Sequence, residues 1–361
     1  MRILHVTDCF HSGVATAIDQ YARLTPEYEH LLLANNARGT APAVARRAGT
    51  FAVDMELPEN PAGAVKAVRD TVRDLRPDLV HAHSSFGGAY ARTAAFLDRI
   101  TPGRIPAPVV YTPHSFSFER QDLSRVKKAV ARGMESLLLP LTAVGAPCAD
   151  REGELMVELG HSFGSFGRKI PVIVVPNALS TAGTDKLGSW SPTTPKTVGV
   201  ISRVTPQRDP AFFAATAELI RARRPDTRFV WIGDDDGKDP ALSAVLEDAE
   251  VEVTGWLTGE ELHQRVAGLS LVIHTAAWDG FPMAVLEVRQ VGVPLLIRDI
   301  PSLAECPASA RFSTPEEAAA KAVAILDAGV DPAFWDGLDR AHTPEIQRTR
   351  LGEVYDLAVG R

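Results

Sequence analysis

The chain has 361 residues, of which 45% are hydrophobic and 23% charged, a composition typical of a globular protein with room for two domains. A formal charge of -7 argues against a general nucleic-acid binder, so an anionic ligand would need a local positive site. The three cysteines are widely spaced and suggest neither a disulfide framework nor a zinc site. The chain opens on a strand pattern in place of a signal peptide, and no segment reaches the ~20 apolar residues of a membrane span. We therefore expect a cytoplasmic protein whose membrane contact, if it has one, is peripheral.

Short apolar runs alternate with longer helical patterns along the whole chain. In the first half this pattern predicts strands at residues 3–6, 30–34, 79–83, 109–113, 141–144 and 172–175. A polar stretch rich in glycine, serine, proline and threonine, residues 180–196, is typical of a linker. The second half predicts strands at residues 197–201, 228–232, 251–254, 271–274 and 294–298. The sequence therefore predicts two doubly wound α/β domains, whose ligands bind beyond the carboxyl ends of the strands.

Three segments of the first half carry candidate functional residues. After the first strand, Gly13 would let a ligand approach the backbone, although an ordinary strand-to-helix turn explains it equally well. Two later strands end in His83 and His114 beside small hydroxyl residues. His81 and His83 also raise the possibility of a metal site, but no third ligand of suitable type and spacing follows them.

A basic amphipathic helix is predicted from Arg120 to Glu135. Its arginines and lysines recur at near-helical spacing, with Val126, Val130 and Met134 on a four-residue period. Such a helix can lie on an anionic membrane surface or meet a phosphorylated lipid carrier, and a solvated helix face is the alternative.

In the second half, Arg203 and Arg208 follow a strand end, where guanidinium groups suit the oxygens of a diphosphate. Further along, residues 278–287 predict a strand, a tight turn at Gly280 and a helix that includes Pro282 in its first turn. The first amides of that helix favour a docked anion. Asp279 and Glu287, at the two ends of the segment, would face a sugar and a ribose diol.

The segment from Asp279 to Glu287 resembles the Glu-x7-Glu signature of retaining glycosyltransferases of the GT-B fold, family four (group 1 type). The loop at residues 202–209 is similar to the family's Gly-Arg-Leu-x-x-x-Lys-Gly loop, with Arg203 in the arginine position and Arg208 in place of the lysine. Ser12-Gly13 resembles the family's Gly-Gly loop, and the Thr-x-His pattern falls on His114. Asp279 is one methylene shorter than the family's glutamate.

The resemblance implies an α/β fold of two Rossmann-like domains facing a central cleft. The N-terminal acceptor-side domain would span residues 1–178, the nucleotide-sugar domain residues 179–342, and residues 343–361 would form a helix that returns to the N-terminal domain. The implied reaction is retaining transfer of a sugar from a nucleotide diphosphate donor to a hydroxyl acceptor of the lipid-linked or cell-envelope kind, with no metal or other cofactor. The implied catalytic residues are Arg203, Arg208, Asp279 and His114. The implied donor-binding residues are Gly13, Gly233, Gly280, Phe281, Pro282, Met283 and Glu287.

Three alternatives remain open from the sequence. Asp234 and Asp236 match the Asp-x-Asp pattern with which glycosyltransferases of the other common fold, GT-A, bind manganese, although a nucleotide loop or an acidic turn also fits. A sugar-nucleotide epimerase of GT-B fold would share the cleft. A catalytically silent sugar-nucleotide-binding protein would bind the donor without turning it over.

Overall fold

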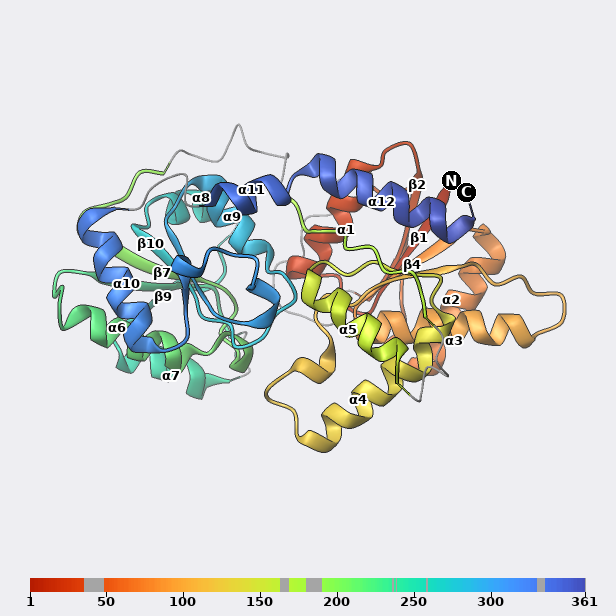
Figure 1. Cartoon of the computed structure of the whole chain (residues 1–361), viewed down its shortest axis with the longest axis horizontal. Coiled ribbons are helices and arrows are strands. Elements are labelled where there is room, and N and C mark those ends of the chain that lie inside the picture. The colour runs from red at the N-terminus through yellow and green to blue at the C-terminus, as the bar shows by residue number, and fades with distance from the viewer. Residues whose placement is uncertain are drawn as a thin grey trace. The chain divides into compact units, whose positions relative to one another are not determined.

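The computed structural model describes residues 1–35, 49–162, 169–179, 190–235, 237, 239–257, 259–329 and 335–360. Most of the predicted linker, residues 180–189, and Asp236 of the Asp-x-Asp pattern lie outside this part of the chain. The chain forms two compact units, Met1–Asn177 with Pro344–Arg361, and Ala178–Thr343 (Figure 1). Each unit contains one six-stranded sheet.

The N-terminal unit is a parallel sheet with strand order β3-β2-β1-β4-β5-β6. Its strands are β1 (Arg2–Thr7), β2 (Glu29–Ala34), β3 (Val53–Glu56), β4 (Leu79–His83), β5 (Val109–Thr112) and β6 (Val144–Gly145). Its described helices are α1 (Ser12–Leu24), α2 (Pro61–Leu75), α3 (Ser85–Ile100), α4 (Arg125–Leu138), α5 (Asp150–Gly160) and α12 (Pro344–Val359), with short 3-10 turns η1 (Ser117–Glu119) and η2 (Leu139–Leu141).

The C-terminal unit repeats this plan with strand order β12-β11-β10-β7-β8-β9, again all parallel. Its strands are β7 (Thr197–Ile201), β8 (Arg228–Ile232), β9 (Glu252–Val253), β10 (Leu271–His274), β11 (Leu295–Arg298) and β12 (Arg311–Phe312). Its described helices are α6 (Pro210–Arg221), α7 (Pro240–Asp248), α8 (Gly259–Ala267), α9 (Met283–Val291), α10 (Pro315–Ala328) and α11 (Asp336–Ala341), with 3-10 turns η5 (Pro206–Arg208), η6 (Pro301–Leu303) and η7 (Ala308–Ala310).

Several helices begin at a polar cap followed by proline. The side chain of Asn60 accepts a hydrogen bond from the third residue of α2, and Asp209 and Thr314 do the same for α6 and α10. In each case proline is the next residue, where its missing N–H costs nothing and its fixed φ suits a helix. These local signals explain why the helices start where they do.

Buried apolar clusters lie on both faces of the N-terminal sheet, and a further cluster packs against the C-terminal sheet. In the N-terminal unit, one face packs on α1 and on the last helix, α12, whose Leu351, Val354 and Tyr355 are fully buried. Figure 1 shows α12 running beside α1 over this sheet. The chain thus ends by completing the core of the unit in which it begins. Within the described residues, none of the helices combines the length and the apolar character needed to cross a lipid bilayer.

Two strand predictions in the N-terminal unit are wrong. Residues 139–141 form η2, and β6 follows only at Val144–Gly145. Residues 172–175 run beside β6 but form a single bridge, between Val172 and Gly145. Ile173 N–H donates to the Gly145 carbonyl at 2.9 Å, but the next bond back would need an N–H from Pro147, which has none. Val175 N–H still donates to the Pro147 carbonyl at 2.8 Å, but without the bond from Pro147 the segment does not form a strand.

Candidate active site

In the C-terminal unit, the loop that carries Arg203 is fastened to the carboxyl end of the neighbouring strand β8. Val204 N–H donates to the Asp234 carbonyl at 2.8 Å, and the Trp231 indole N–H donates to the Ser202 carbonyl at 2.8 Å. The backbone on both sides of Arg203 is therefore held, and its half-buried side chain starts from the edge of the sheet where ligands bind in such folds.

Gly233 is the residue that lets this loop lie so close to β8. Its φ is +143°, and a Cβ placed on it would lie 1.9 Å from the Ser202 carbonyl oxygen. No L residue with a side chain fits there without moving backbone. The structure thus gives Gly233 a packing role in placing Arg203.

Arg208 and Asp279, which are 71 residues apart, form an ion pair between Nη1 and Oδ2. The same guanidinium lies 3.3 Å from Nε2 of His274, and because arginine only donates, that nitrogen is the acceptor. Burial, followed by the charge of Arg208, lowers the pKa of His274 to about 4, so this ring is neutral. The Thr275 hydroxyl donates to the Arg208 carbonyl at 2.5 Å. The sequence did not point to His274 or Thr275, which end and follow β10.

Further hydrogen bonds join the loop after β7 to the segment after β10. The Gln207 side-chain amide donates to the Trp278 carbonyl at 2.8 Å, and Ala277 N–H donates to the Gln207 carbonyl at 2.9 Å. Asp209, in the left-handed region at φ +53°, caps α6 and accepts from Arg298 at 2.6 Å. The ends of β7, β8 and β10 therefore form one hydrogen-bonded edge.

The helix after the Asp279 turn begins later than predicted. Pro282 is the N-cap of α9, with an extended ψ of 126°, so the helix starts at Met283 and ends before Gly292. Asp279 Oδ1 accepts from Gly280 N–H at 2.9 Å, which closes the turn before the helix. The backbone N–H groups that face outward from the start of the helix are therefore those of Met283 and Ala284, because Pro282 has no N–H and Val285 N–H donates to the Pro282 carbonyl at 3.1 Å.

Side chains around this turn divide between core and solvent. The Phe281 ring is buried and stacks on His342 with ring centroids 4.3 Å apart, and Met283 is also buried. These two side chains therefore belong to the core of the unit. Glu287, one turn after Met283, is exposed.

The acidic turn after β8 makes hydrogen bonds to its own backbone. Asp234 Oδ1 accepts from Asp235 N–H at 2.7 Å, and Asp235 Oδ1 accepts from Gly237 N–H at 2.7 Å. Such bonds are typical of a tight turn rich in aspartate.

In the N-terminal unit, the loop after β1 is tied to the start of α3. Asp8, which is buried, accepts from the Ser84 hydroxyl and from Gly87 N–H. Gly13 lies in the first turn of α1, on its exposed side. Asp8 is a polar residue that the sequence analysis missed, and its only signal was its position at a strand end.

His114 follows β5 in an unusual backbone conformation. Its φ is +49° and that of Ser115 is +82°, both in the left-handed region that costs energy for residues with a side chain. The buried carboxylate of Glu152 holds the turn, because it accepts from Ser115 N–H and, at 3.0 Å, from Cys148 N–H. Burial raises the pKa of Glu152, and these backbone bonds oppose the shift. Glu152 is a second supporting residue that the sequence did not reveal.

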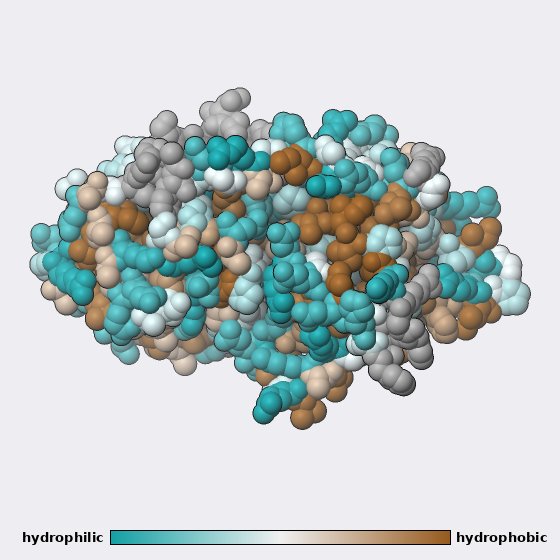
Figure 2. All heavy atoms as spheres, viewed as in Figure 1, coloured by the Kyte–Doolittle hydropathy of each residue, from teal (hydrophilic) through white to brown (hydrophobic). Residues whose placement is uncertain are grey.

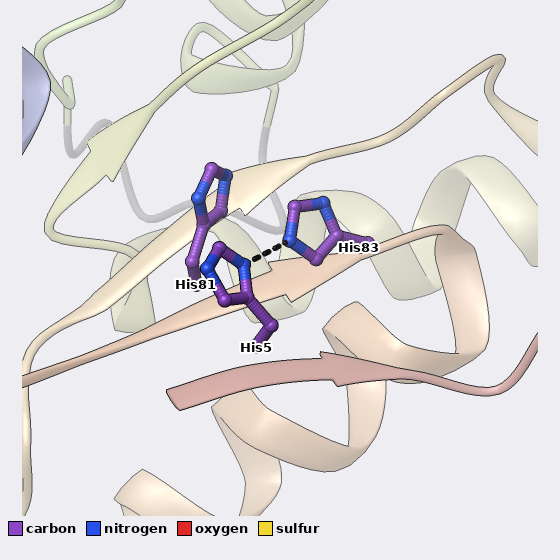
Figure 3. A group of neighbouring side chains, drawn as sticks. All are labelled: His5, His81 and His83. Atoms are coloured by element: carbon purple, nitrogen blue, oxygen red, sulfur yellow. Dashed lines mark hydrogen bonds between the residues drawn. The ribbon is translucent and has the colours of Figure 1, made fainter. Parts of the chain in front are cut away.

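No third ligand was expected to follow His81 and His83 along the chain, but the structure places one beside them that precedes them, His5. β1 and β4 are paired so that His5 lies opposite His81, and all three rings project from one face of the sheet (Figure 3). In the described residues these are the one group of histidine, cysteine or acidic side chains close enough to share a metal ion. His5 was not found because its partners are 76 and 78 residues away.

The basic helix also differs from its prediction. α4 spans Arg125–Leu138, and Arg120 lies before it in an ion pair with Asp122 at 2.6 Å. Its far end is anchored by a buried ion pair of 2.8 Å between Glu135 and Arg92. The opposite face carries four exposed apolar side chains: Val126, Val130, Met134 and Leu137.

Two parallel Rossmann-like sheets, with arginines and a helix start at one edge of the second, define a protein of the GT-B glycosyltransferase fold. The chain belongs to the group 1 glycosyl transferases: residues 12–178 match the glycosyl transferase 4-like domain, and residues 195–328 match the glycosyl transferases group 1 domain. It is 24% identical over 238 residues to the UDP-Gal:alpha-D-GlcNAc-diphosphoundecaprenol alpha-1,3-galactosyltransferase of Escherichia coli, a match covering 62% of this chain and 58% of that enzyme. The match thus spans little more than half of the length of this relative.

Solved structures share the fold over nearly the whole chain. Sucrose-phosphate synthase from Thermosynechococcus elongatus superimposes with a TM-score of 0.70 at 13% identity, covering 100% of this chain and 97% of that one. The Anabaena HepE protein in complex with UDP-glucose gives a TM-score of 0.66 at 17% identity, covering 99% and 96%.

Proposed function

We propose that this protein is a retaining, metal-independent glycosyltransferase that moves a hexose from a UDP-sugar to a hydroxyl of a lipid-linked acceptor. The observation that carries the proposal is the single hydrogen-bonded edge formed by the ends of β7, β8 and β10, which gathers Arg203, Arg208 and Asp279 in front of the start of α9. The similarity to a galactosyltransferase that uses UDP-galactose and a diphosphoundecaprenol acceptor supports this choice of donor and acceptor.

The chemistry follows from where charge develops. As the glycosidic bond to the donor breaks, negative charge grows on the departing diphosphate. Arg203, Arg208 and the free amides at the start of α9 would stabilise that charge, and such fixed electrostatic groups usually supply the largest part of catalysis. These groups supply the kind of positive field that a divalent cation provides in other transferases, which is why we propose that none is needed.

Asp279 has two functions in this proposal. Its Oδ2 atom holds Arg208 in place before the donor arrives, so that the guanidinium does not have to be ordered during the reaction. A carboxylate also accepts hydrogen bonds from sugar hydroxyls. Glu287, exposed on α9, would accept from the ribose diol.

Helix α4 supports contact with an anionic membrane surface. Val126 is 74% exposed, and Lys127 and Lys128 stand next to it at the start of the helix. Figure 2 shows brown and teal spheres side by side where α4 lies at the bottom of the view. Exposed apolar side chains flanked by lysines favour a surface of acidic lipid headgroups, where each lysine contributes about 1 kcal/mol. This would place the protein at the inner face of the membrane.

The first test measures UDP release from a panel of UDP-, GDP- and ADP-sugars, with and without EDTA and with a lipid extract as acceptor. We expect acceptor-dependent, EDTA-resistant release from one UDP-hexose. Release that EDTA abolishes would contradict metal independence. Hydrolysis to free nucleotide and an altered sugar without any acceptor indicates an epimerase, and tight donor binding without release indicates a silent binder. The anomeric configuration of the product, read by NMR, tests retention.

A variant pair tests the site itself. We expect Arg203→Ala to lower kcat by about 100-fold or more, the usual effect of removing one such electrostatic donor. The matched control is Arg340→Ala, whose side chain is 76% exposed on α11 and forms an ion pair with Asp336, one turn away. Turnover of Arg203→Ala close to that of the control would rule out the assigned role.

A second pair tests the membrane contact. The double variant Lys127→Glu, Lys128→Glu should bind vesicles of mixed anionic and zwitterionic lipid at least tenfold more weakly, measured by sedimentation. Each substitution removes an attraction of about 1 kcal/mol and adds a repulsion. Lys66→Glu with Arg340→Glu, two exposed cations outside α4, changes the net charge by the same amount and is the control. Equal loss in both variants, or none in either, would refute docking through α4.

A further inference from the structure

A chain of hydrogen-bonded imidazoles crosses four adjacent strand positions of the N-terminal sheet. Nδ1 of His30, on β2, lies 3.0 Å from Nε2 of His5, on β1. Nδ1 of His5 lies 3.0 Å from Nε2 of His83, on β4, the bond drawn in Figure 3. Nδ1 of His83 lies 3.2 Å from Nε2 of His114, which follows β5. The chain leads from the interior of the unit to the strand end where His114 is half-buried.

At the inner end of this chain, the contacts of His30 fix which of its ring nitrogens carries the proton. Nε2 of His30 lies 3.0 Å from the backbone carbonyl of Thr25, which only accepts. It also lies 3.1 Å from the Thr25 hydroxyl, which already donates to the Tyr21 carbonyl at 2.8 Å and so offers His30 a lone pair. Both contacts require the proton of His30 to be on Nε2.

The tautomer of His30 then determines the tautomer of each following histidine. Burial lowers the pKa of His5, His30 and His83 and lowers that of His114 to about 4, so each ring is neutral near pH 7 and carries one N–H. Because Nδ1 of His30 bears no proton, His5 must donate from Nε2, and the same argument applies to His83. His114 in turn donates from Nε2. Its Nδ1 is left with a lone pair and, within the described part of the chain, has no hydrogen-bond partner.

The neighbouring His81 shows why these rings are unsuited to a metal ion. Its Nε2 lies 2.9 Å from the Thr112 hydroxyl, which donates to the Ala146 carbonyl at 2.7 Å, and its Nδ1 lies 3.0 Å from the Tyr355 hydroxyl. Both nitrogens of His81 are thus engaged, as are both nitrogens of His5 and His83. A metal would have to break several buried hydrogen bonds before it gained its first ligand.

We propose that His30, His5 and His83 are positioning residues that lock His114 in the Nε2–H tautomer, so that its Nδ1 accepts a hydrogen bond from a hydroxyl group of the bound donor sugar. The chain ends on a carbonyl that cannot take up a proton, so it orients His114 and does not carry protons away. The part of the proposal that concerns a sugar hydroxyl rests on the proposed function, whereas the tautomer lock does not.

The lock itself is tested without any ligand. Two-dimensional 15N–1H NMR of the full chain, labelled on histidine, distinguishes protonated from bare ring nitrogens. We expect His114 to show a bare Nδ1 and a protonated Nε2 at pH 7. The key variant is His30→Phe, which removes the inner end three rings away, and the control is His81→Phe, an equally buried histidine outside the chain. We expect His30→Phe alone to convert His114 to a mixture of tautomers.

Three results would overturn the lock. One is a proton on Nδ1 of His114 in the unmodified chain. Another is an unchanged tautomer in His30→Phe. The third is displacement of the ring protons of His5 and His83 by stoichiometric Zn²⁺, which would show a metal site in place of a hydrogen-bonded chain. The unmodified protein alone decides the first and third, so the proposal remains testable even if a variant does not fold.

The ligand contact is tested with UDP-sugars in which each hydroxyl in turn is replaced by fluorine or by hydrogen. Fluorine accepts hydrogen bonds but does not donate, so it cannot satisfy a bare Nδ1. At one position we expect the fluoro sugar to bind at least tenfold more weakly than the natural UDP-sugar, as weakly as the deoxy sugar does. In His30→Phe the affinities of the fluoro sugar and the natural UDP-sugar should differ by less than threefold. Binding is measured in place of turnover because fluorine also slows bond cleavage. Tolerance of fluorine at every position would overturn the contact, whereas failure of every nucleotide sugar to bind would overturn the proposed function and leave the NMR result standing.

Discussion

Replacing Gly233 by alanine should destabilise the C-terminal unit, because the loop that carries Arg203 leaves no room for a side chain there. A Cβ at this position would lie 1.9 Å from the Ser202 carbonyl oxygen and 2.7 Å from its carbon, both backbone atoms. The loop cannot simply retreat, since Ser202 N–H donates to the Ile232 carbonyl at 3.0 Å and its carbonyl accepts from Trp231. A positive φ costs an L residue about 1–3 kcal/mol, and breaking two partly buried hydrogen bonds costs about 1 kcal/mol each. We therefore expect a loss of about 3–5 kcal/mol.

The assay is thermal unfolding followed by circular dichroism, together with binding of UDP. For a unit of this size 1 kcal/mol corresponds to about 2–4 °C, so Tm should fall by about 6–20 °C. Gly255→Ala is the control, because Gly255 also has a positive φ, +71°, but its nearest new contact is 4.0 Å away. If the loop shifts to make room for the new Cβ and Tm is preserved, the resulting displacement of Arg203 should weaken UDP binding. A variant that matches the control in both Tm and UDP affinity would refute the packing argument.

Three further predictions concern buried charge. Arg92→Met should leave the buried Glu135 carboxylate without its positive partner, with only the Tyr111 hydroxyl donating to it among the described residues, and should lower the free energy of unfolding by about 3–5 kcal/mol in a urea titration. Arg350→Met, which breaks the exposed ion pair with Glu353, should change the free energy of unfolding by under about 1 kcal/mol. Glu152→Gln should cost about 1–3 kcal/mol in the same titration, because a backbone N–H loses a charged acceptor; no change would argue against its role in the turn. His274 stays neutral in the folded state down to a pKa of about 4, so the unfolded chain takes up its proton first and stability falls as pH drops below about 6.5. Between pH 6 and 5 its replacement by Gln should reduce this slope by about 1 kcal/mol per pH unit, and an identical slope would show that the ring titrates normally.

Some elements of the fold were predictable because their sequence pattern is local. β7 and β8 have the predicted bounds, as continuous apolar runs buried on both faces usually form inner strands. β3 was missed because it is an edge strand in which Asp54 and Glu56 alternate with apolar residues, and a four-residue alternation is a weak signal. The prediction of a strand at residues 172–175 was wrong for a non-local reason, because Pro147 on the neighbouring segment has no N–H to donate.

In the candidate site, too, local motifs were predictable from the sequence, whereas contacts between distant segments were not. Arg203, Arg208 and Asp279 stand in recognisable motifs, but the ion pair between the last two depends on how β7 and β10 lie in the sheet. The histidine chain depends even more on register, because a shift of one residue would turn His5 to the other face of the sheet. One signal was available: His5 and His30 are polar residues within apolar strand runs, and a polar side chain in such a place needs a buried partner.

The two units present different chemistry at the ends of their strands, and this difference predicts a separation of binding roles. The C-terminal edge carries two arginines and a helix start, which suit a diphosphate, whereas the N-terminal edge carries the neutral His114 ring and suits a hydroxyl group. His114→Phe should therefore leave the affinity for UDP within about twofold, because a neutral ring contributes little to binding an anion. The additional affinity of the UDP-sugar over UDP should fall about tenfold, the value of one hydrogen bond of about 1.4 kcal/mol. Isothermal titration with both ligands makes the comparison, and Arg203→Ala should show the reverse pattern, a loss for UDP and UDP-sugar alike. If His114→Phe weakens both ligands equally, the ring helps to hold the diphosphate or the fold, and the division of roles is wrong.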